Sequence, residues 1–396
     1  MTPVKLAYLV SHPIQYQAPL LRRLAELPWL DLTVFFESDF SLHGYHDPGF
    51  GRTVSWDVPL TEGYDHRFLA RVEDPDAELD AAGFVADLRE DGFEALWLHG
   101  YARPFNMRVL QRARPQGLKV LLRDEATEIS LERGFVKRLL KRLYFAYLDR
   151  RVDAYLAIGS LNRAYYRSQG IAAEKIFDVP YCVDNDQFRE LAEAAAPHRE
   201  ILRDGLGLEP GRLVILYASK LMGRKCPDDL LEAFLGLPEG EAAPYLLFVG
   251  EGELEARLKA RVAEAPPSAQ ARVRFLGFKG QRELPAYLDL ADVLALPSLR
   301  EPWGLIVNEA MCAGAAILVS DRVGATPDLV RDGGNGRVVP AGDVAALRAA
   351  LAELVFDPER LAQMGTRSRE IIAGWSYDQD IDGLKAALSA LYPGRL

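Results

Sequence analysis

The sequence has few cysteines and no long hydrophobic run, and each absence narrows the class of protein. Among 396 residues there are only Cys182, Cys226 and Cys312, with no C-x-x-C spacing. A sparse, odd set argues against a disulfide framework and a cysteine-rich zinc site. The apolar run at 6–10 is too short for the core of a signal peptide, and no unbroken run approaches the roughly 18 residues of a spanning helix. We therefore expect a cytoplasmic protein that does not cross a membrane.

An excess of basic residues is also absent. The chain has 47 Lys and Arg against 57 Asp and Glu, a formal net charge of −10, which disfavours general binding to nucleic acid. The sequence further lacks a post-strand G-x-G-x-x-G fingerprint, a P-loop, a G-x-S-x-G elbow and an H-E-x-x-H motif. The motifs therefore do not indicate a dinucleotide-binding protein, a P-loop NTPase, a serine hydrolase or a zinc protease.

The chain does contain short apolar segments that alternate with helical ones. The apolar segments are unbroken rather than alternating, as is typical of strands buried on both faces of a parallel sheet. They lie at 4–10, 32–36, 95–99, 119–123, 154–158, 213–218, 245–250, 273–276, 293–296 and 316–320. This order predicts α/β domains with doubly wound parallel sheets.

The chain is expected to divide where a polar, Ala-rich segment and several glycines cover 185–211. We expect an N-terminal Rossmann-like domain over 1–200 and a C-terminal one over 203–375. Segment 376–396 is expected to form a helix that packs back on the N-terminal domain. Ligands of parallel sheets bind beyond the carboxyl ends of the strands, so we expect the domains to face a central cleft.

The most informative stretch is 297–314, where a Pro/Gly turn leads from a strand into a helix that would begin near Gly304. The free N–H groups of a helix start can hold an anion. Glu301 in the turn and Glu309 in the helix could accept hydrogen bonds from sugar hydroxyls. Alternatively, Glu309 only complements the helix dipole and Glu301 is a surface charge.

Positive charge gathers in a second loop, after the segment at 213–218. Lys220, Arg224 and Lys225 lie there in a protein of net negative charge. A site for a diphosphate would need such local cations. Solvated surface lysines are the alternative.

Together these stretches resemble the retaining family-4 glycosyltransferases, of the glycosyl transferases group 1 type and GT-B fold. Glu301 and Glu309 form an E-x7-E pattern around Trp-Gly-Leu and Glu-Ala that is similar to the donor-site signature of that family. The resemblance extends over nearly all of 212–340, with further similar blocks in the family's order at 216–234, 248–255, 273–278, 284–298 and 321–336.

The resemblance implies a donor site in the C-terminal domain. By their matching positions, Lys220 and Lys225 contact the diphosphate, Glu309 the ribose, and Glu301 the region of the donor sugar. The remaining donor-side positions are the neighbouring Arg224, the post-strand Gly250, Phe278 in the nucleobase loop, and the backbone groups of Trp303, Gly304 and Leu305.

Three positions depart from the family pattern. Lys220 stands where the family normally has Arg, which keeps the charge and loses bidentate geometry. Cys226 stands in place of Gly, and Trp303 in place of Phe.

The resemblance also implies an acceptor side in the first half of the chain. His99 ends a strand and matches the histidine that the family presents to the sugars, although a lone histidine is more often structural. His12 and Gln15 lie in the loop that replaces a glycine-rich one, with helix capping as the alternative. Tyr101 and Asp124 also follow strands and are candidate acceptor contacts.

The implied reaction is transfer of a sugar from a nucleotide diphosphate sugar, UDP- or GDP-linked, to a hydroxyl of a glycan, lipid-linked or small-molecule acceptor. It would retain the anomeric configuration and need no metal ion or cofactor. The D-x-D spacing of Asp184 and Asp186 is interpreted as a turn and cap. The alternatives are a GT-B sugar-nucleotide epimerase or hydrolase, and a non-catalytic sugar-nucleotide-binding partner.

Segment 133–151 has seven basic residues against Asp149, with Phe, Leu and Tyr between them. It could rest on anionic lipid at the inner face of the membrane. An ordinary amphipathic helix that covers the first sheet is the alternative.

Overall fold

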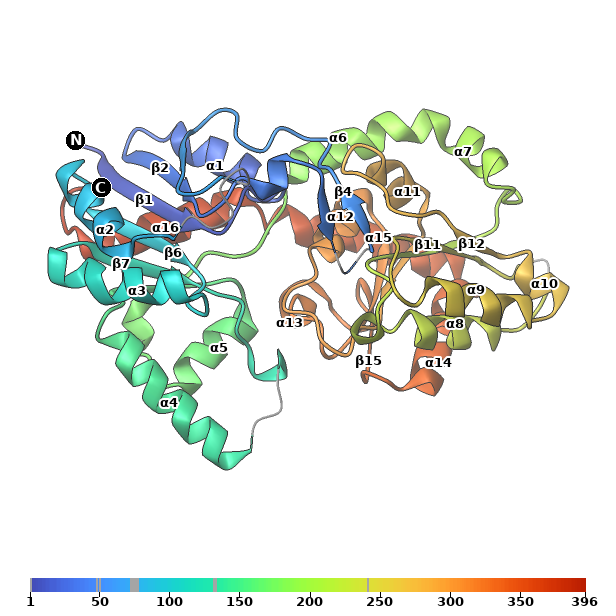
Figure 1. Cartoon of the computed structure of the whole chain (residues 1–396). Helices are drawn as coiled ribbons and strands as arrows, with labels where there is room; N and C mark the ends of the chain where they lie inside the picture. The colour runs from blue at the N-terminus through green and yellow to red at the C-terminus, as the bar shows by residue number, and fades with distance from the viewer. Residues whose placement is uncertain (1, 48, 50, 72–77, 131–133, 241) are drawn as a thin grey trace. The chain divides into compact units, whose positions relative to one another are not determined.

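The computed structural model describes residues 1–396 except 1, 48, 50, 72–77, 131–133 and 241. The chain divides into two compact units, coloured by residue number in Figure 1. The first unit comprises Met1–Tyr45, Val58–Tyr181 and Tyr377–Leu396. The second unit comprises His46–Asp57 and Cys182–Ser376. Each unit is built around its own parallel sheet, so the predicted fold class is confirmed.

Within the described residues, the sheet of the first unit has seven parallel strands in the order β5-β2-β1-β6-β7-β8-β9. The strands are β1 (Val4–Val10), β2 (Leu30–Phe36), β5 (Asp65–Phe68), β6 (Ala95–His99), β7 (Lys119–Arg123), β8 (Ala154–Ala157) and β9 (Ile176–Asp178). The five predicted strands are all present. The edge strands β5 and β9 escaped prediction because β5 carries polar residues and β9 is short.

Helices cover both faces of this sheet. They are α1 (Ala18–Ala25), α2 (Ala81–Glu90), α3 (Pro104–Ala113), α4 (Phe135–Asp149), α5 (Ser160–Ser168) and α16 (Tyr377–Leu391). The inner sides of α2, α3, α4 and α5 share one apolar core with β6, β7 and β8. Helix α1 contacts β2, and α16 packs on β8 and β9.

A buried ion pair holds α16 against the sheet. Arg123 Nη2 lies 3.0 Å from Asp380 Oδ2, and the two side chains are 2% and 0% exposed. Arg123 also donates hydrogen bonds to two backbone carbonyls that follow β9. A Cβ on Gly383 would lie 1.7 Å from the carbonyl oxygen of Asp178, so glycine allows α16 to approach β9 this closely. The end of the chain is therefore part of the first unit's core.

The sheet of the second unit has six parallel strands among the described residues, in the order β12-β11-β10-β13-β14-β15. They are β10 (Val214–Ala218), β11 (Tyr245–Val249), β12 (Val273–Phe275), β13 (Val293–Leu296), β14 (Ala316–Ser320) and β15 (Gly336–Val339). The five predicted strands are again present, and the edge strand β15 is the addition.

Helices also flank the second sheet. They are α6 (Asn185–Ala195), α7 (Arg199–Gly205), α8 (Pro227–Leu235), α9 (Glu255–Ala263), α10 (Pro267–Gln270), α11 (Leu284–Leu290), α12 (Leu305–Ala313), α13 (Thr326–Leu329), α14 (Val344–Val355) and α15 (Pro358–Ala373). Residues of α8, α9, α14 and α15 share a core with the strands. Helices α6, α11 and α12 pack on one another. No helix in the described part of the chain is long and apolar enough to span a bilayer.

The two units divide the chain differently from the ranges expected from the sequence. Residues 182–200 group with the second unit, because α6 packs on α11 and α12 and Asn185 donates hydrogen bonds to backbone carbonyls of Ile372 and Trp375. The segment His46–Asp57, which carries most of a small sheet of β3 (Tyr45–Asp47) and β4 (Arg52–Val54), also groups there. The expected cleft between the domains stays a prediction.

We predict that Asp380→Asn lowers the free energy of unfolding by about 3–5 kcal/mol, because it leaves the Arg123 cation buried without its counter-ion. Urea unfolding above pH 7 measures the loss. Asp378→Asn is the matched control, because that carboxylate pairs with Arg23 at 2.8 Å while 66% of its side chain is exposed. The control should lose less than about 1 kcal/mol. Equal losses in the two variants would contradict a special role for the buried pair.

Candidate functional site

The loops beyond the strands of the second unit form one connected edge. Backbone hydrogen bonds of 2.8–2.9 Å join the loop after β10 to those after β11 and β13, and the loop after β11 to the one after β12. These loops contain the predicted donor-side residues. Because these loops are hydrogen-bonded to one another, the position of each loop depends on its neighbours as well as on its own strand.

Lys225 and Glu301 form an ion pair in this edge. Lys225 ends a 3-10 turn, Gly223–Lys225, before α8, and Glu301 lies in the turn between β13 and α12. Both residues are nearly buried, at 8% and 9% exposure. Glu301 is fixed by its backbone as well, since its N–H donates to Arg322 and its carbonyl accepts from Gly324. The fold thus brings together two residues that lie 76 positions apart in the sequence.

Lys220 is paired as well. Its Nζ lies 2.7 and 2.9 Å from the two carboxylate oxygens of Asp47, in the segment that joins the second unit from the first half of the chain. Arg224 points differently, because its guanidinium donates to the carbonyl of Arg300 at 3.2 Å. The three cations of the loop are therefore held by separate partners.

Helix α12 begins at the same edge. Its N-cap is Gly304, with φ 95°, and no side chain of the described residues caps that end. Trp303 packs inward, 3% exposed, where its ring stacks on Trp375 at 5.6 Å and its Nε1 donates to Asn308. The tryptophan thus anchors the turn. The backbone N–H groups at Leu305 and after it are the part of this turn suited to an anion.

Glu309 lies on the second turn of α12 and is 9% exposed. In the described part of the chain no hydrogen bond or ion pair to its carboxylate is present. Burial raises the pKa of Glu309 to about 7 from its ordinary value of 4.5. This carboxylate could accept hydrogen bonds from the hydroxyl groups of a ligand.

We predict that Glu309→Gln changes how stability depends on pH. A raised pKa means that the folded protein binds the proton more tightly, so the stabilisation is complete below pH 4.5 and is lost as pH rises through about 7. The wild type should lose up to roughly 3 kcal/mol across this window relative to the Gln variant. Urea unfolding at several pH values without ligand measures the difference. Glu359→Gln, at an exposed position of α15, should follow the wild-type profile, and a parallel profile for Glu309→Gln would contradict the assignment.

Cys226, which replaces the family's glycine, adopts the left-handed conformation with φ 53° and ψ 45°. It is the N-cap of α8 and the one non-glycine residue with positive φ among those described. Its thiol is buried and lies 3.6 Å from the carbonyl oxygen of Gly223. Cys226 therefore bears the strain of a side chain in a conformation that glycine adopts more readily.

We predict that Cys226→Gly is more stable than Cys226→Ala by about 1 kcal/mol, because both remove the thiol and only glycine relieves the backbone strain. Urea unfolding of the two variants measures this. Ala233→Gly, inside α8, is the opposite control and should lower stability by about 1 kcal/mol. Equal stability of Cys226→Ala and Cys226→Gly would show that the turn is unstrained.

The expected nucleobase loop has a neighbour that the sequence did not predict. The Phe278 N–H donates to Glu251 Oε1 at 3.2 Å, and the Phe278 ring meets Trp56 edge-on at 6.3 Å. Asp57 accepts hydrogen bonds from the N–H groups of Gln281 and Arg282. A Cβ on Gly250 would lie 2.1 Å from the carbonyl oxygen of Ser219, so this glycine serves close packing of two loops.

In the first unit, His99 lies at the end of β6 between two tyrosines. The Tyr8 hydroxyl is 3.0 Å from Nδ1, and the Tyr181 hydroxyl is 3.3 Å from Nε2. Tyr8 also contacts Gln17 Oε1 at 3.0 Å, and Tyr181 contacts Glu125 Oε1 at 2.9 Å. A chain of polar groups therefore runs through the imidazole.

The protonation of His99 follows from its surroundings. Burial lowers the pKa of His99 to about 3, assisted by the Arg123 and His12 charges. The ring is therefore neutral at physiological pH and carries one N–H. Each tyrosine has a single proton, so only one hydroxyl can donate outward while the other donates to the ring. Because a carboxylate only accepts, Tyr181 donates to Glu125 and accepts from the ring N–H on Nε2, while Tyr8 donates to Nδ1.

The other acceptor-side predictions lie in different surroundings. His12 Nδ1 contacts Ser11 Oγ at 2.8 Å, and burial lowers the pKa of His12 to about 4. Gln15 is half-buried in the same loop. Tyr101 accepts a hydrogen bond from Lys141, and Asp124 caps its own loop by accepting from the Ala126 N–H. Burial raises the pKa of Asp124 to about 6.

The D-x-D stretch acts as a cap, since Asp184 accepts from the Gln187 N–H at the start of α6 and Asp186 pairs with Arg189. Among the described residues, no group of three or more His, Cys, Asp or Glu is placed to hold a metal ion. Metal independence stays a prediction.

Sequence reasoning missed several residues of these networks. Asp47, Trp56 and Asp57 lie far from the C-terminal motifs in sequence, and no local pattern marks them. Tyr8 and Tyr181 are buried within and after strands, where tyrosine is ordinary core. Only the fold places them beside predicted residues.

Part of the chain is similar to a known family. The sequence profile of the family described as Glycosyl transferases group 1 matches residues 198–371. This region belongs to the group 1 glycosyltransferases. The chain is also similar to a D-inositol 3-phosphate glycosyltransferase of Nocardia farcinica, with 31% identity over 226 residues, which are 56% of this chain and 49% of that protein.

A second relative of the group 1 region is a GDP-mannose-dependent alpha-(1-6)-phosphatidylinositol monomannoside mannosyltransferase of Mycolicibacterium smegmatis. It is 32% identical over 233 residues, 57% of this chain and 58% of that protein. The chain thus spans about half the length of these curated relatives. The structure is similar to that of Anabaena HepE in complex with UDP and glucose, with a TM-score of 0.71 and 17% identity over 98% of this chain and 100% of that one. This likeness confirms the GT-B fold.

Proposed function

We propose that this chain is a glycosyltransferase that moves a sugar from a nucleotide diphosphate sugar to an acceptor hydroxyl and retains the anomeric configuration. The observation that carries the proposal is the edge of the second unit. There the Lys225–Glu301 pair, Lys220 and the turn that leads into α12 lie on loops that are hydrogen-bonded together, and Glu309 follows on the second turn of α12. This combination of cations, N–H groups and a hydroxyl acceptor suits a sugar nucleotide.

UDP- and GDP-sugars are the donors that we propose. The HepE structure holds UDP and glucose, and the mycobacterial relative is named as GDP-mannose-dependent. Glu309 would accept hydrogen bonds from the ribose hydroxyls, which would give its carboxylate the partners that it lacks. Phe278 and Gly250 would border the base, and the backbone at Trp303, Gly304 and Leu305 would meet phosphate and sugar oxygens.

Departure of the diphosphate is the step that these cations would assist. Negative charge grows on the phosphate oxygen as its bond to the sugar carbon breaks, and preorganised cations and N–H dipoles stabilise that charge. Lys220 would exchange Asp47 for the diphosphate. Lys225 stays in place through Glu301, which lies near the reacting sugar in this proposal. The acceptor proton would pass to a donor phosphate oxygen, so no covalent intermediate and no metal ion are required.

The acceptor side of the proposal lies in the first unit. A neutral His99 would donate its single N–H to a sugar hydroxyl in exchange for its 3.3 Å contact with Tyr181, while the Tyr8 hydroxyl at Nδ1 keeps the plane of the ring. His12, Gln15, Tyr101 and Asp124 are the proposed acceptor contacts. A glycan, a lipid-linked sugar or a small polyol would each present suitable hydroxyls.

A thermal-shift panel with UDP, GDP, ADP, dTDP, CMP and NAD tests the donor site. We expect one nucleoside diphosphate to stabilise the protein, by about 2.7 kcal/mol at 100 times its dissociation constant. Glu309→Ala and Lys225→Met should each weaken that binding by roughly 10- to 100-fold, because each removes a partner of a charged hydrogen bond. Glu359→Ala, at an exposed position of α15, should bind as the wild type does.

His99→Ala separates the two halves of the proposal. It should leave nucleotide affinity near normal and lower turnover with the matching sugar nucleotide. Stabilisation by NAD alone, or by none of the six compounds, would refute the donor site. Full turnover by His99→Ala would refute the acceptor assignment alone.

A further inference from the structure

Helix α4 of the first unit has two apolar faces. Phe145 and Leu148 are fully buried in the core of that unit. A second set, Val136, Leu139, Leu140 and Leu143, is 51–67% exposed. The described part of the chain has eight exposed large apolar residues, and four of them belong to this set. The concentration on one helix calls for a partner surface.

The exposed set forms a continuous stripe, which we call the α4 stripe: Val136, Leu139, Leu140 and Leu143. Its spacing of three, four and seven residues places all four side chains on one side of a helix with 3.6 residues per turn. By the same geometry the stripe lies roughly opposite Phe145. Packing of the hydrophobic core therefore does not explain why these four positions are apolar.

Basic side chains border the stripe on both sides. By helical position, Lys137 lies along one edge and Arg142 along the other. Residues 135–148 contain four basic residues and no acidic one, within a protein of net charge −10. Local charge of this sign next to exposed leucines matches an anionic lipid surface, where leucines enter the acyl region and cations meet phosphates.

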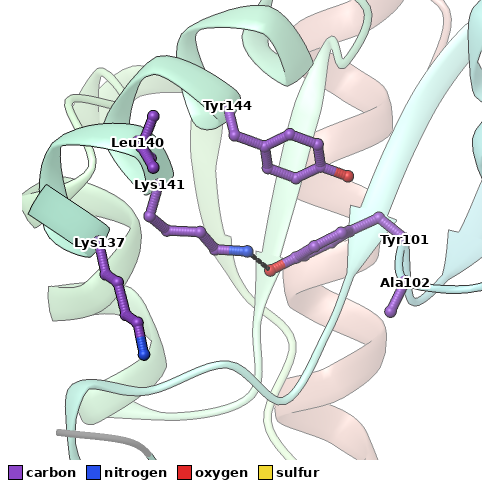
Figure 2. Close-up of a pocket in the computed structure, with 6 residues that line it drawn as sticks. All are labelled: Tyr101, Ala102, Lys137, Leu140, Lys141 and Tyr144. Carbon is purple, nitrogen blue, oxygen red and sulfur yellow. Dashed lines mark hydrogen bonds between the residues drawn. The ribbon is translucent and has the colours of Figure 1, made fainter. Parts of the chain in front are cut away.

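An open pocket of about 470 Å³ adjoins the stripe, lined by Tyr101, Ala102, Lys137, Leu140, Lys141 and Tyr144. Figure 2 shows Lys141 reaching from α4 to Tyr101, to which it donates a hydrogen bond of 2.7 Å. Its Nζ also lies 4.6 and 4.9 Å from the ring centres of Tyr101 and Tyr144. Tyrosine rings and a lysine beside an exposed leucine are suited to the boundary between headgroups and acyl chains.

We propose that the α4 stripe and its basic borders dock this protein on an anionic lipid bilayer. A second copy of the chain fits less well, since a stable protein interface needs about 20 residues a side and the stripe offers four apolar ones. Like-charged basic borders would also repel across a symmetric contact. The proposal does not rest on the glycosyltransferase proposal, because it concerns only attachment to the surface, although Tyr101 belongs to both.

Vesicle co-sedimentation of the full-length protein tests this proposal. We expect binding to vesicles of phosphatidylcholine mixed with phosphatidylglycerol that is at least about tenfold tighter than binding to phosphatidylcholine alone, and that weakens with salt, since each basic residue near the surface contributes roughly fivefold. Leu139→Ser/Leu143→Ser should weaken binding by roughly tenfold or more. Lys137→Glu/Arg142→Glu should abolish the preference for anionic vesicles.

Ile201→Ser/Phe356→Ser is the matched control. These apolar side chains are 70% and 45% exposed and belong to the second unit rather than to α4, so their loss should leave vesicle binding unchanged. All substituted positions are exposed, and circular dichroism with the unfolding midpoint checks that each variant is folded. Failure of the wild type to bind anionic vesicles, or undiminished binding by the stripe variant, would overturn the proposal. So would a dimer in analytical ultracentrifugation that the stripe substitutions dissociate.

Discussion

Parallel strands that are buried on both faces leave polar side chains few places to gather. In each unit the central strands are almost entirely apolar, and the sheets are covered by helices. Polar chemistry is therefore confined to the loops beyond the strand ends. This constraint explains why residues from four post-strand loops of the second unit meet at one edge, and why His99 lies at the last position of β6.

Several charged side chains are largely buried and are paired with a residue of opposite charge. Arg123 with Asp380, Lys225 with Glu301, and Lys220 with Asp47 each satisfy a cation with a carboxylate from a distant part of the chain. Glu309 differs, because it is 9% exposed and no ion pair to its carboxylate is present among the described residues. Ion pairs of this kind are expensive to desolvate and are tolerated where they position groups. This carboxylate is therefore available to accept hydrogen bonds from the hydroxyl groups of a ligand.

The surroundings of His99 determine its protonation state. An exposed histidine would be partly protonated near neutral pH, but burial and the Arg123 cation keep this one neutral. Tyr8 and Tyr181 then occupy both ring nitrogens. The same Arg123 binds Asp380 of α16, so the last helix of the chain is connected to the surroundings of His99 through one guanidinium.

The sequence by itself determined the parallel α/β class, ten of the strands and the post-strand segments that bear Lys220, Lys225, Glu301, Glu309 and His99. Continuous apolar runs, and the Gly or Pro residues that follow them, are local signals. They are reliable here because most of these strands are buried on both faces of a parallel sheet. The edge strands β5, β9 and β15, the partners Asp47 and Trp56, and the tyrosines of His99 were decided only by tertiary structure. So was the outward stripe of α4, because the helical period alone does not say which of two apolar faces the core takes. Contacts between residues far apart in sequence arise from packing, and no local pattern encodes them.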